Sequence, residues 1–140
     1  MNKKIITLLI VSMLIFPITA YANTDNTPSP QASEYIRSTS AVITPGDDGE
    51  LLLENKLGAT RIVDKLGIIS LELQTKVNGY WRTIDTLVTD DYLYDTGTYI
   101  YDCYYYATSG KEYRSYVEFY VENDGGSEIK IVTSEPVTLN

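Results

Sequence analysis

The amino-acid sequence predicts an all-β fold, namely a two-sheet antiparallel sandwich of about seven strands, with a small β-barrel as the alternative. Three observations indicate this fold class. Short runs rich in Val, Ile, Thr and Tyr follow one another along the chain, clusters of Gly, Asn and Asp separate them, and no segment shows the apolar periodicity of a helix.

The first 22 residues have the three parts of a secretory signal peptide in the expected order. Lys3 and Lys4 precede an apolar run of 14 residues, Ile5–Ile18, and the small-residue pattern Ala20–Ala22 follows. The run is shorter than the roughly 20 residues that a membrane-spanning helix needs. We therefore expect residues 1–22 to be removed, leaving a secreted, extracellular protein with no stable membrane insertion.

Residues 23–32 (NTDNTPSPQA) are polar and contain two prolines, so they are predicted to form a flexible linker before a domain at 33–140. Without the signal peptide the chain has 118 residues, which suits one domain. It also has 9 basic and 19 acidic groups, a net charge of −10. Such an acidic chain repels nucleic acid and anionic surfaces, so nucleic acid is excluded as a partner.

Seven runs form the predicted strands: 35–44, 50–57, 66–77, 80–88, 97–107, 112–122 and 128–139. Residues 45–49 (PGDDG) form a turn between the first two. Asn78-Gly79 joins the third and fourth as a two-residue hairpin, because both central positions of a type I′ turn need positive φ. Residues 124–126 (DGG) play the same part between the last two runs.

Alternation of apolar and polar residues assigns faces in two of these runs, giving each strand one core face and one solvent face. In the third run the predicted core residues are Ile69, Leu71, Leu73 and Val77. In the sixth run they are Tyr113, Val117, Phe119 and Val121. This pattern favours a sandwich of immunoglobulin or fibronectin type.

Tyr113 stands near the start of the sixth run, three residues after Gly110. This placement is similar to the tyrosine corner of fibronectin-like domains, in which a tyrosine hydroxyl binds upstream backbone where the chain crosses between sheets. If Tyr113 has that role, the short loop 108–110 is a crossing and not a hairpin.

Several segments occur in one order: 65–69 (KLGII), 79–84 (GYWRTI), 110–113 (GKEY), 117–120 (VEFY) and 125–127 (GGS). Together they resemble a group of small secreted proteins of Firmicutes that is classified only as a domain of unknown function. The resemblance implies export and an immunoglobulin- or fibronectin-like β-sandwich, and it supplies no catalytic residue. The tyrosine-rich region 99–106 and its cysteine depart from what such relatives lead us to expect.

Composition argues against an enzyme. The chain has no histidine, which excludes Ser-His-Asp triads, Cys-His pairs and the usual zinc sites. Paired carboxylates could still support glycoside hydrolysis. No motif, however, places a nucleophile beside a base, and the domain is small for a substrate cleft.

Cys103, the only cysteine, is predicted to be a small buried side chain, with an intermolecular disulfide as the alternative.

Calcium is the one cofactor that the sequence suggests, because this ion takes oxygen ligands and inter-strand loops can group them. The two candidate clusters are Asp47 with Asp48, and Asp90 and Asp91 with Asp95. Neither has the spacing of an EF-hand loop. Solvated turn residues are the competing interpretation.

Tyrosine is the main compositional oddity, since eight of the 13 lie between positions 99 and 120. Parity places Tyr99, Tyr101 and Tyr105 inward with Cys103. It places four others outward as candidate ligand-binding residues: Tyr104, Tyr106, Tyr116 and Tyr120. If loop 108–110 closes a hairpin, these four share one aromatic platform for sugars or a protein partner. If the loop is a crossing, they lie on opposite faces, and the ordinary strand preference of tyrosine explains them.

Trp81, beside the 78–79 turn, is a further candidate contact if it is exposed near Tyr104 or Tyr120.

The leading functional prediction is a secreted, non-catalytic binding or interaction module for an unknown protein or carbohydrate, released or loosely associated with the cell surface. The alternatives are a self-associating structural protein of the cell surface or matrix and a carboxylate-based glycoside hydrolase. We expect a monomer or weak self-association.

Overall fold

A computed structural model describes residues 33–140, so the predicted signal peptide and linker lie outside the described residues. Within this part the chain forms six strands and no helix. They are β1 (Ile36–Pro45), β2 (Glu50–Val77), β3 (Tyr80–Tyr106), β4 (Lys111–Asn123), β5 (Gly126–Thr133) and β6 (Val137–Leu139). Every pairing is antiparallel, which confirms the predicted all-β class.

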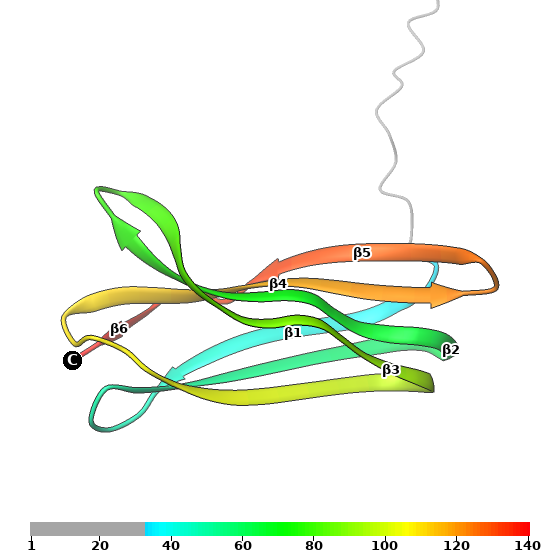
Figure 1. Cartoon of the computed structure of the whole chain (residues 1–140), viewed down its shortest axis with the longest axis horizontal. Helices are drawn as coiled ribbons and strands as arrows, with labels where there is room; N and C mark the ends of the chain where they lie inside the picture. The colour runs from blue at the N-terminus through cyan, green and yellow to red at the C-terminus, as the bar shows by residue number, and fades with distance from the viewer. Residues whose placement is uncertain (1–32) are drawn as a thin grey trace, which may run out of the picture. The chain divides into compact units, whose positions relative to one another are not determined.

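The long strand β2 organises the sheet (Figure 1). β3 pairs with β2 along one edge for nearly its whole length. On the other edge the first half of β2 pairs with β1, and the second half pairs with β4. β5 and β6 then pair with β4. All six strands therefore belong to one continuous sheet.

β2 and β3 turn back together near the middle of their length, so the sheet curls over itself (Figure 1). The register breaks there: Gly58 pairs with Thr98 and Val63 with Thr96, so residues 59–62 lie opposite Gly97 alone. The predicted runs 50–57 and 66–77 are thus two halves of β2, and 80–88 and 97–107 are two halves of β3. The chain stays extended and paired through segments whose polar residues suggested loops, so these two mergers leave five strands and one curled sheet in place of two. The predicted run 128–139 is divided at residues 134–136 into β5 and β6, which makes six strands in all.

The hydrophobic core fills the concave side of the curled sheet. Both halves of β2 and the middle of β4 contribute to it, with Leu51, Leu53, Leu71, Leu73, Val117, Phe119 and Val121 fully buried. The predicted core face of the sixth run is confirmed. In the third run Ile69 is only half-buried and Ile68 is buried, because a register shift between Ile68 and Ser70 inserts one residue. Val77 is exposed because it lies beyond the last β2–β4 pair, Thr75 with Tyr113.

Two predicted turns have the expected backbone. Asn78 and Gly79 have φ of 51° and 82°, and Asp124 and Gly125 have φ of 51° and 78°, as type I′ turns require.

The loop after β3 is different. Tyr113 binds the backbone of Thr108 through its hydroxyl, and β3 pairs with β2 only, so residues 108–110 form a crossing as the tyrosine corner predicts.

Candidate functional site

The outward side of the second half of β2 carries a row of aromatic side chains contributed by its neighbours. Cross-strand partners lie on the same side of a sheet. The register therefore places Tyr92 beside Gly67, Gly67 beside Tyr120, and Tyr120 beside Ile129. We call this surface the tyrosine face. Its principal side chains are Trp81 and Tyr92 of β3, Arg114, Tyr116 and Tyr120 of β4, and Ile129 of β5.

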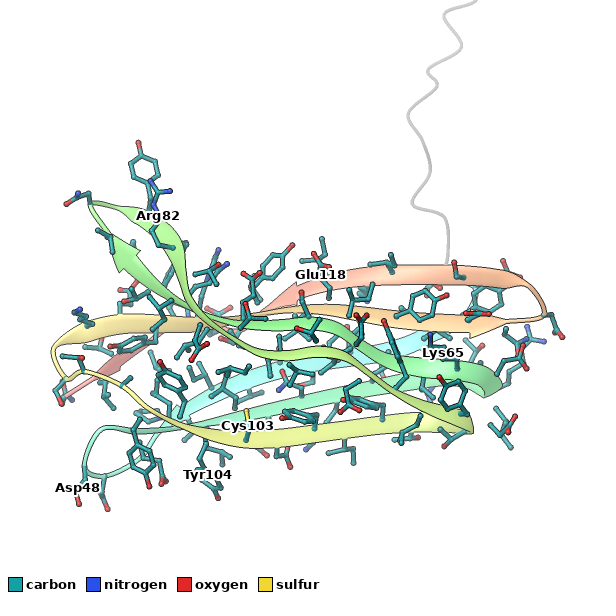
Figure 2. The ribbon with its side chains drawn as sticks, viewed as in Figure 1. Asp48, Lys65, Arg82, Cys103, Tyr104 and Glu118 are labelled. Atoms are coloured by element: carbon teal, nitrogen blue, oxygen red, sulfur yellow. The ribbon has the colours of Figure 1, made fainter. Side chains whose placement is uncertain are left out.

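The structure divides the five predicted ligand-binding residues between two surfaces. Trp81, Tyr116 and Tyr120 belong to the tyrosine face. Tyr104 and Tyr106, 64% and 71% exposed, lie level with the first half of β2. Figure 2 shows Tyr104 and Glu118, the neighbour of Tyr116 and Tyr120 on β4, projecting from opposite sides of the domain. The single platform of four tyrosines does not form, because the crossing at 108–110 prevents β3 and β4 from pairing.

Gly67 lies at the centre of the best-defined aromatic cluster. Its two register partners, Tyr92 and Tyr120, approach each other across it in an edge-to-face arrangement with ring centroids 5.7 Å apart. The ammonium of Lys65 lies 3.9 Å from the Tyr92 ring centroid and 5.4 Å from that of Tyr120 (Figure 2). These distances are those of cation–π interactions. The absent side chain of Gly67 lets the β3 backbone at Asp91 and Tyr92 lie close to β2 at this point.

The tyrosine hydroxyls of this face are bonded to carboxylates two residues away on the same strand. Tyr92 donates to Asp90 (2.9 Å), Tyr116 to Glu118 (3.2 Å) and Tyr120 to Glu122 (2.6 Å). Burial and then the hydrogen bond to Asp90 raise the pKa of Tyr92 to about 12. Burial and then the hydrogen bond to Glu118 raise the pKa of Tyr116. The hydrogen bond to Glu122 and then burial raise the pKa of Tyr120. Each hydroxyl is therefore hydrogen bonded within its own strand, and this bond fixes the orientation of the ring.

Trp81 belongs to a second cluster at the other end of the same face. The Arg114 guanidinium carbon lies 4.5 Å from its ring and the Lys76 ammonium 5.4 Å from it. Trp81 pairs with Lys76, which binds Glu112 (3.1 Å), eight residues before Tyr120. At about 3.4 Å per residue this is about 27 Å along β4. Trp81 is half-buried and lies at the far end of the face from Tyr120, so it does not share a ligand contact with that residue.

Four polar side chains adjoin Trp81 in one network across three strands. Arg114 donates from Nε to Oε1 of Gln74 (2.9 Å), and Thr83 donates to Oε2 of Glu72 (2.6 Å). Nε2 of Gln74 donates to the same carboxylate oxygen (3.3 Å) and lies 3.4 Å from Oγ1 of Thr83. Gln74 itself is only 9% exposed. The network fixes both ends of its carboxamide.

Sequence reasoning missed Tyr92 and Lys65 as members of this surface. It placed Gln74 and Arg114 on the solvent faces of their strands but did not predict their contacts. Tyr92 stood in the interval 89–96, which was assigned to no strand and therefore to no face. The alternation of Tyr92 and Tyr94 around Leu93 was the available signal. The contacts of Lys65 and Arg114 depend on strand neighbours that lie far away in sequence.

The predicted calcium ligands lie in two separate places. Asp47 and Asp48 are exposed in the β1–β2 turn. Asp90 accepts a hydrogen bond from Tyr92, whereas Asp91 accepts one from the buried hydroxyl of Tyr99 (2.8 Å). Among residues 33–140 no three acidic or cysteine side chains are close enough to hold a metal ion. Calcium binding therefore stays a prediction. A melting temperature that neither millimolar calcium nor a chelator changes would exclude it.

The inward side of the second half of β3 agrees with the sequence prediction. Tyr99 is buried, and Tyr101, Cys103 and Tyr105 are partly buried against the core. Burial, and then the charge of Asp102, raise the pKa of the Cys103 thiol. A thiol in this setting is a poor nucleophile because the reactive species is the thiolate.

Comparisons with known proteins add little. No protein-family model matches the chain, and no curated protein matches it. Among solved structures, the crystal structure of a family 76 glycoside hydrolase from a bovine Bacteroides thetaiotaomicron strain matches with a TM-score of 0.31 and 17% identity. The match covers 76% of this chain and 21% of that one, so the chain spans about a fifth of its length. Within the described residues, no helix is long and apolar enough to cross a membrane.

Proposed function

We propose that this protein is a secreted, non-catalytic β-domain that binds an extracellular carbohydrate chain through the tyrosine face. The observation that carries the proposal is the arrangement of Tyr92, Tyr116 and Tyr120. All three side chains are partly exposed on this face, and their hydrogen bonds to carboxylates on the same strand fix the orientation of the rings. Aromatic rings of this kind stack on the apolar faces of sugars.

The polar groups around these rings suit the same ligand class. Carboxylates of Glu118 and Glu122 stand beside Tyr116 and Tyr120 and can accept hydrogen bonds from sugar hydroxyls. The face also mixes charges, with Lys65 close to two of the rings. An immunoglobulin- or fibronectin-like origin, a Firmicutes source and export by residues 1–22 belong to this proposal as well.

A glycan array probed with matched variants tests the proposal. The double variant Tyr116→Ala/Tyr120→Ala removes rings from the tyrosine face, and Tyr104→Ala/Tyr106→Ala removes the same number of tyrosines from the opposite side. We expect the first variant to bind a recognised glycan at least about ten-fold more weakly, as expected for loss of aromatic contacts, and the second to bind normally. Absence of binding to every glycan, or equal loss in both variants, would reject the proposal.

Self-association is a second candidate because β3 is paired on one edge only. Its other edge presents backbone donors and acceptors that could pair with another chain. Light scattering with and without reductant tests this candidate. A strict monomer in both conditions would exclude it.

A further inference from the structure

The network formed by Glu72, Gln74, Thr83 and Arg114 contains the parts of an acyl-transfer site. Thr83 offers a hydroxyl whose proton already points to a carboxylate, since it donates to Glu72 at 2.6 Å. Gln74 offers a carboxamide whose nitrogen lies 3.4 Å from that hydroxyl oxygen. Arg114 donates to the carbonyl oxygen of the same carboxamide at 2.9 Å. Nucleophile, base, electrophile and oxyanion donor thus belong to one hydrogen-bonded network in which Arg114 contacts the electrophile alone.

The backbone favours a bond between the two side chains. Gln74 and Thr83 are direct register partners in the β2–β3 pair. Directly opposed residues of antiparallel strands have Cβ atoms about 4.5–5.5 Å apart. The three atoms Cγ and Cδ of Gln74 and Oγ1 of Thr83 suffice to bridge such a gap, and the pair lies directly beside the irregularity in register between Leu73 and Gln74.

We propose that Gln74 and Thr83 join spontaneously in an intramolecular ester. Glu72 takes the hydroxyl proton of Thr83 while Oγ1 attacks Cδ of Gln74, and Arg114 stabilises the negative charge that develops on Oε1. The Cδ–Nε2 bond then breaks, and Glu72 returns the proton to the departing nitrogen, to which it is already hydrogen bonded. The Oγ1–Cδ bond replaces the Cδ–Nε2 bond, one ammonia leaves, and Glu72 ends as it began.

Such a bond has a physical use in this protein. The chain has one cysteine and therefore no internal disulfide, the usual covalent support of small exported domains. The β2–β3 hairpin projects beyond the last β2–β4 pair, so its tip has few neighbours (Figure 1). An ester at its base would prevent the two strands from separating. Gln74 is 9% exposed whereas Thr83 is exposed, so Gln74 would shield the new carbonyl carbon from one side.

Peptide mapping of the full chain after export tests the proposal. Trypsin cleaves after Lys65, Lys76, Arg82 and Lys111 and so separates Gln74 (in 66–76) from Thr83 (in 83–111). We expect these two peptides to remain joined, with a mass that is one ammonia lower than the sum of the two unmodified peptide masses. Hydroxylamine, which cleaves esters, should separate them. Two separate peptides with the masses calculated from the sequence, after prolonged incubation at neutral pH, would overturn the proposal.

Variants assign the roles. Thr83→Val and Glu72→Gln should each abolish the joined peptide, while Thr83→Ser, which keeps a hydroxyl, should retain it. Thr86→Val is the matched control, since Thr86 is the register partner of Glu72 and takes no part in the reaction. Circular dichroism confirms that each variant is folded. A joined peptide that persists in Thr83→Val would assign the bond to another residue and refute the proposed pair.

Discussion

Tyr113 and Thr108 are joined by two hydrogen bonds across the β3–β4 crossing. The Tyr113 hydroxyl donates to the carbonyl oxygen of Thr108 (2.8 Å) and accepts from its N–H (3.1 Å). The ring itself is buried in the core, with 2% of its surface exposed. One side chain therefore anchors the segment that sends β4 to its place beside β2.

Replacing Tyr113 with Phe tests this anchor. The variant keeps the buried ring but leaves both backbone groups of Thr108 to water, so we expect the free energy of unfolding to fall by about 1–3 kcal/mol. Urea denaturation measures the change. Tyr106→Phe is the control, because the exposed Tyr106 hydroxyl binds only Glu50 and its loss should cost less than about 0.5 kcal/mol. Equal effects of the two substitutions would contradict the role of Tyr113.

Gly67→Ala should destabilise the protein although it adds one methyl group. A Cβ at this position would overlap the carbonyl oxygen of Asp91 and lie 2.8 Å from Cα of Tyr92, both of them backbone atoms. Relief requires β2 and β3 to separate, which costs about 1–3 kcal/mol. Gly46→Ala is the control, since its nearest neighbour is the flexible Glu50 carboxylate at 3.2 Å. A Gly67→Ala midpoint in urea equal to that of the parent would refute the close approach.

Glu128 should make the protein sensitive to acid. Burial acts to raise the pKa of Glu128, but hydrogen bonds from the Ser33 hydroxyl and the N–H groups of Tyr35 and Ile36 outweigh it and lower the pKa below its ordinary value. The stabilisation is therefore present above the pKa of the unfolded chain and is lost as pH falls through the lower folded pKa.

Glu128→Gln measures this contribution. At neutral pH the variant should be less stable by about 1 kcal/mol, the size of one or two partly exposed hydrogen bonds to a charge. The difference should vanish in acid, when Glu128 of the parent protein is itself protonated. Glu135→Gln, at an exposed position, serves as control. A difference that does not change with pH would contradict the assignment.

Alkaline pH should also unfold the protein. The pKa of Tyr92 is raised to about 12, and burial with the hydrogen bond to Asp91 raises the pKa of Tyr99 as well. Because these folded pKa values lie above the unfolded one, the stabilisation is complete below about pH 10 and is lost as pH rises through the folded values. Urea midpoints should fall over this range, and less steeply in Tyr99→Phe. Identical slopes would exclude Tyr99 as a cause.

Local features of the fold could be predicted from sequence because they depend on neighbouring residues. The φ requirements of Asn78-Gly79 and Asp124-Gly125 are properties of the turn itself. The inward placement of Tyr99, Tyr101 and Cys103 follows from the two-residue period of a strand. Alternation failed at Ile69, where a bulge shifts the faces, because a bulge depends on the register with β4.

The candidate site was predicted less well, for a related reason. Trp81, Tyr116 and Tyr120 were identified as residues of interest, but their neighbours were not. Tyr92 meets Tyr120 and Arg114 meets Trp81 only because β3 and β4 flank the same half of β2. Composition gives no information about such contacts between distant segments.

By itself the sequence determined an acidic all-β chain, its two-residue turns and the faces of the sixth run and of the tyrosines in the fifth, and it offered a tyrosine corner at Tyr113 as one of two alternatives. The tertiary structure alone decided that β2 and β3 are continuous through a bend, that loop 108–110 is a crossing, and that the outward tyrosines lie on two sides. The physical reason is the range of the forces involved. Turn geometry and alternation act over a few residues, whereas the choice of strand partners depends on burying a common core between segments far apart in the chain.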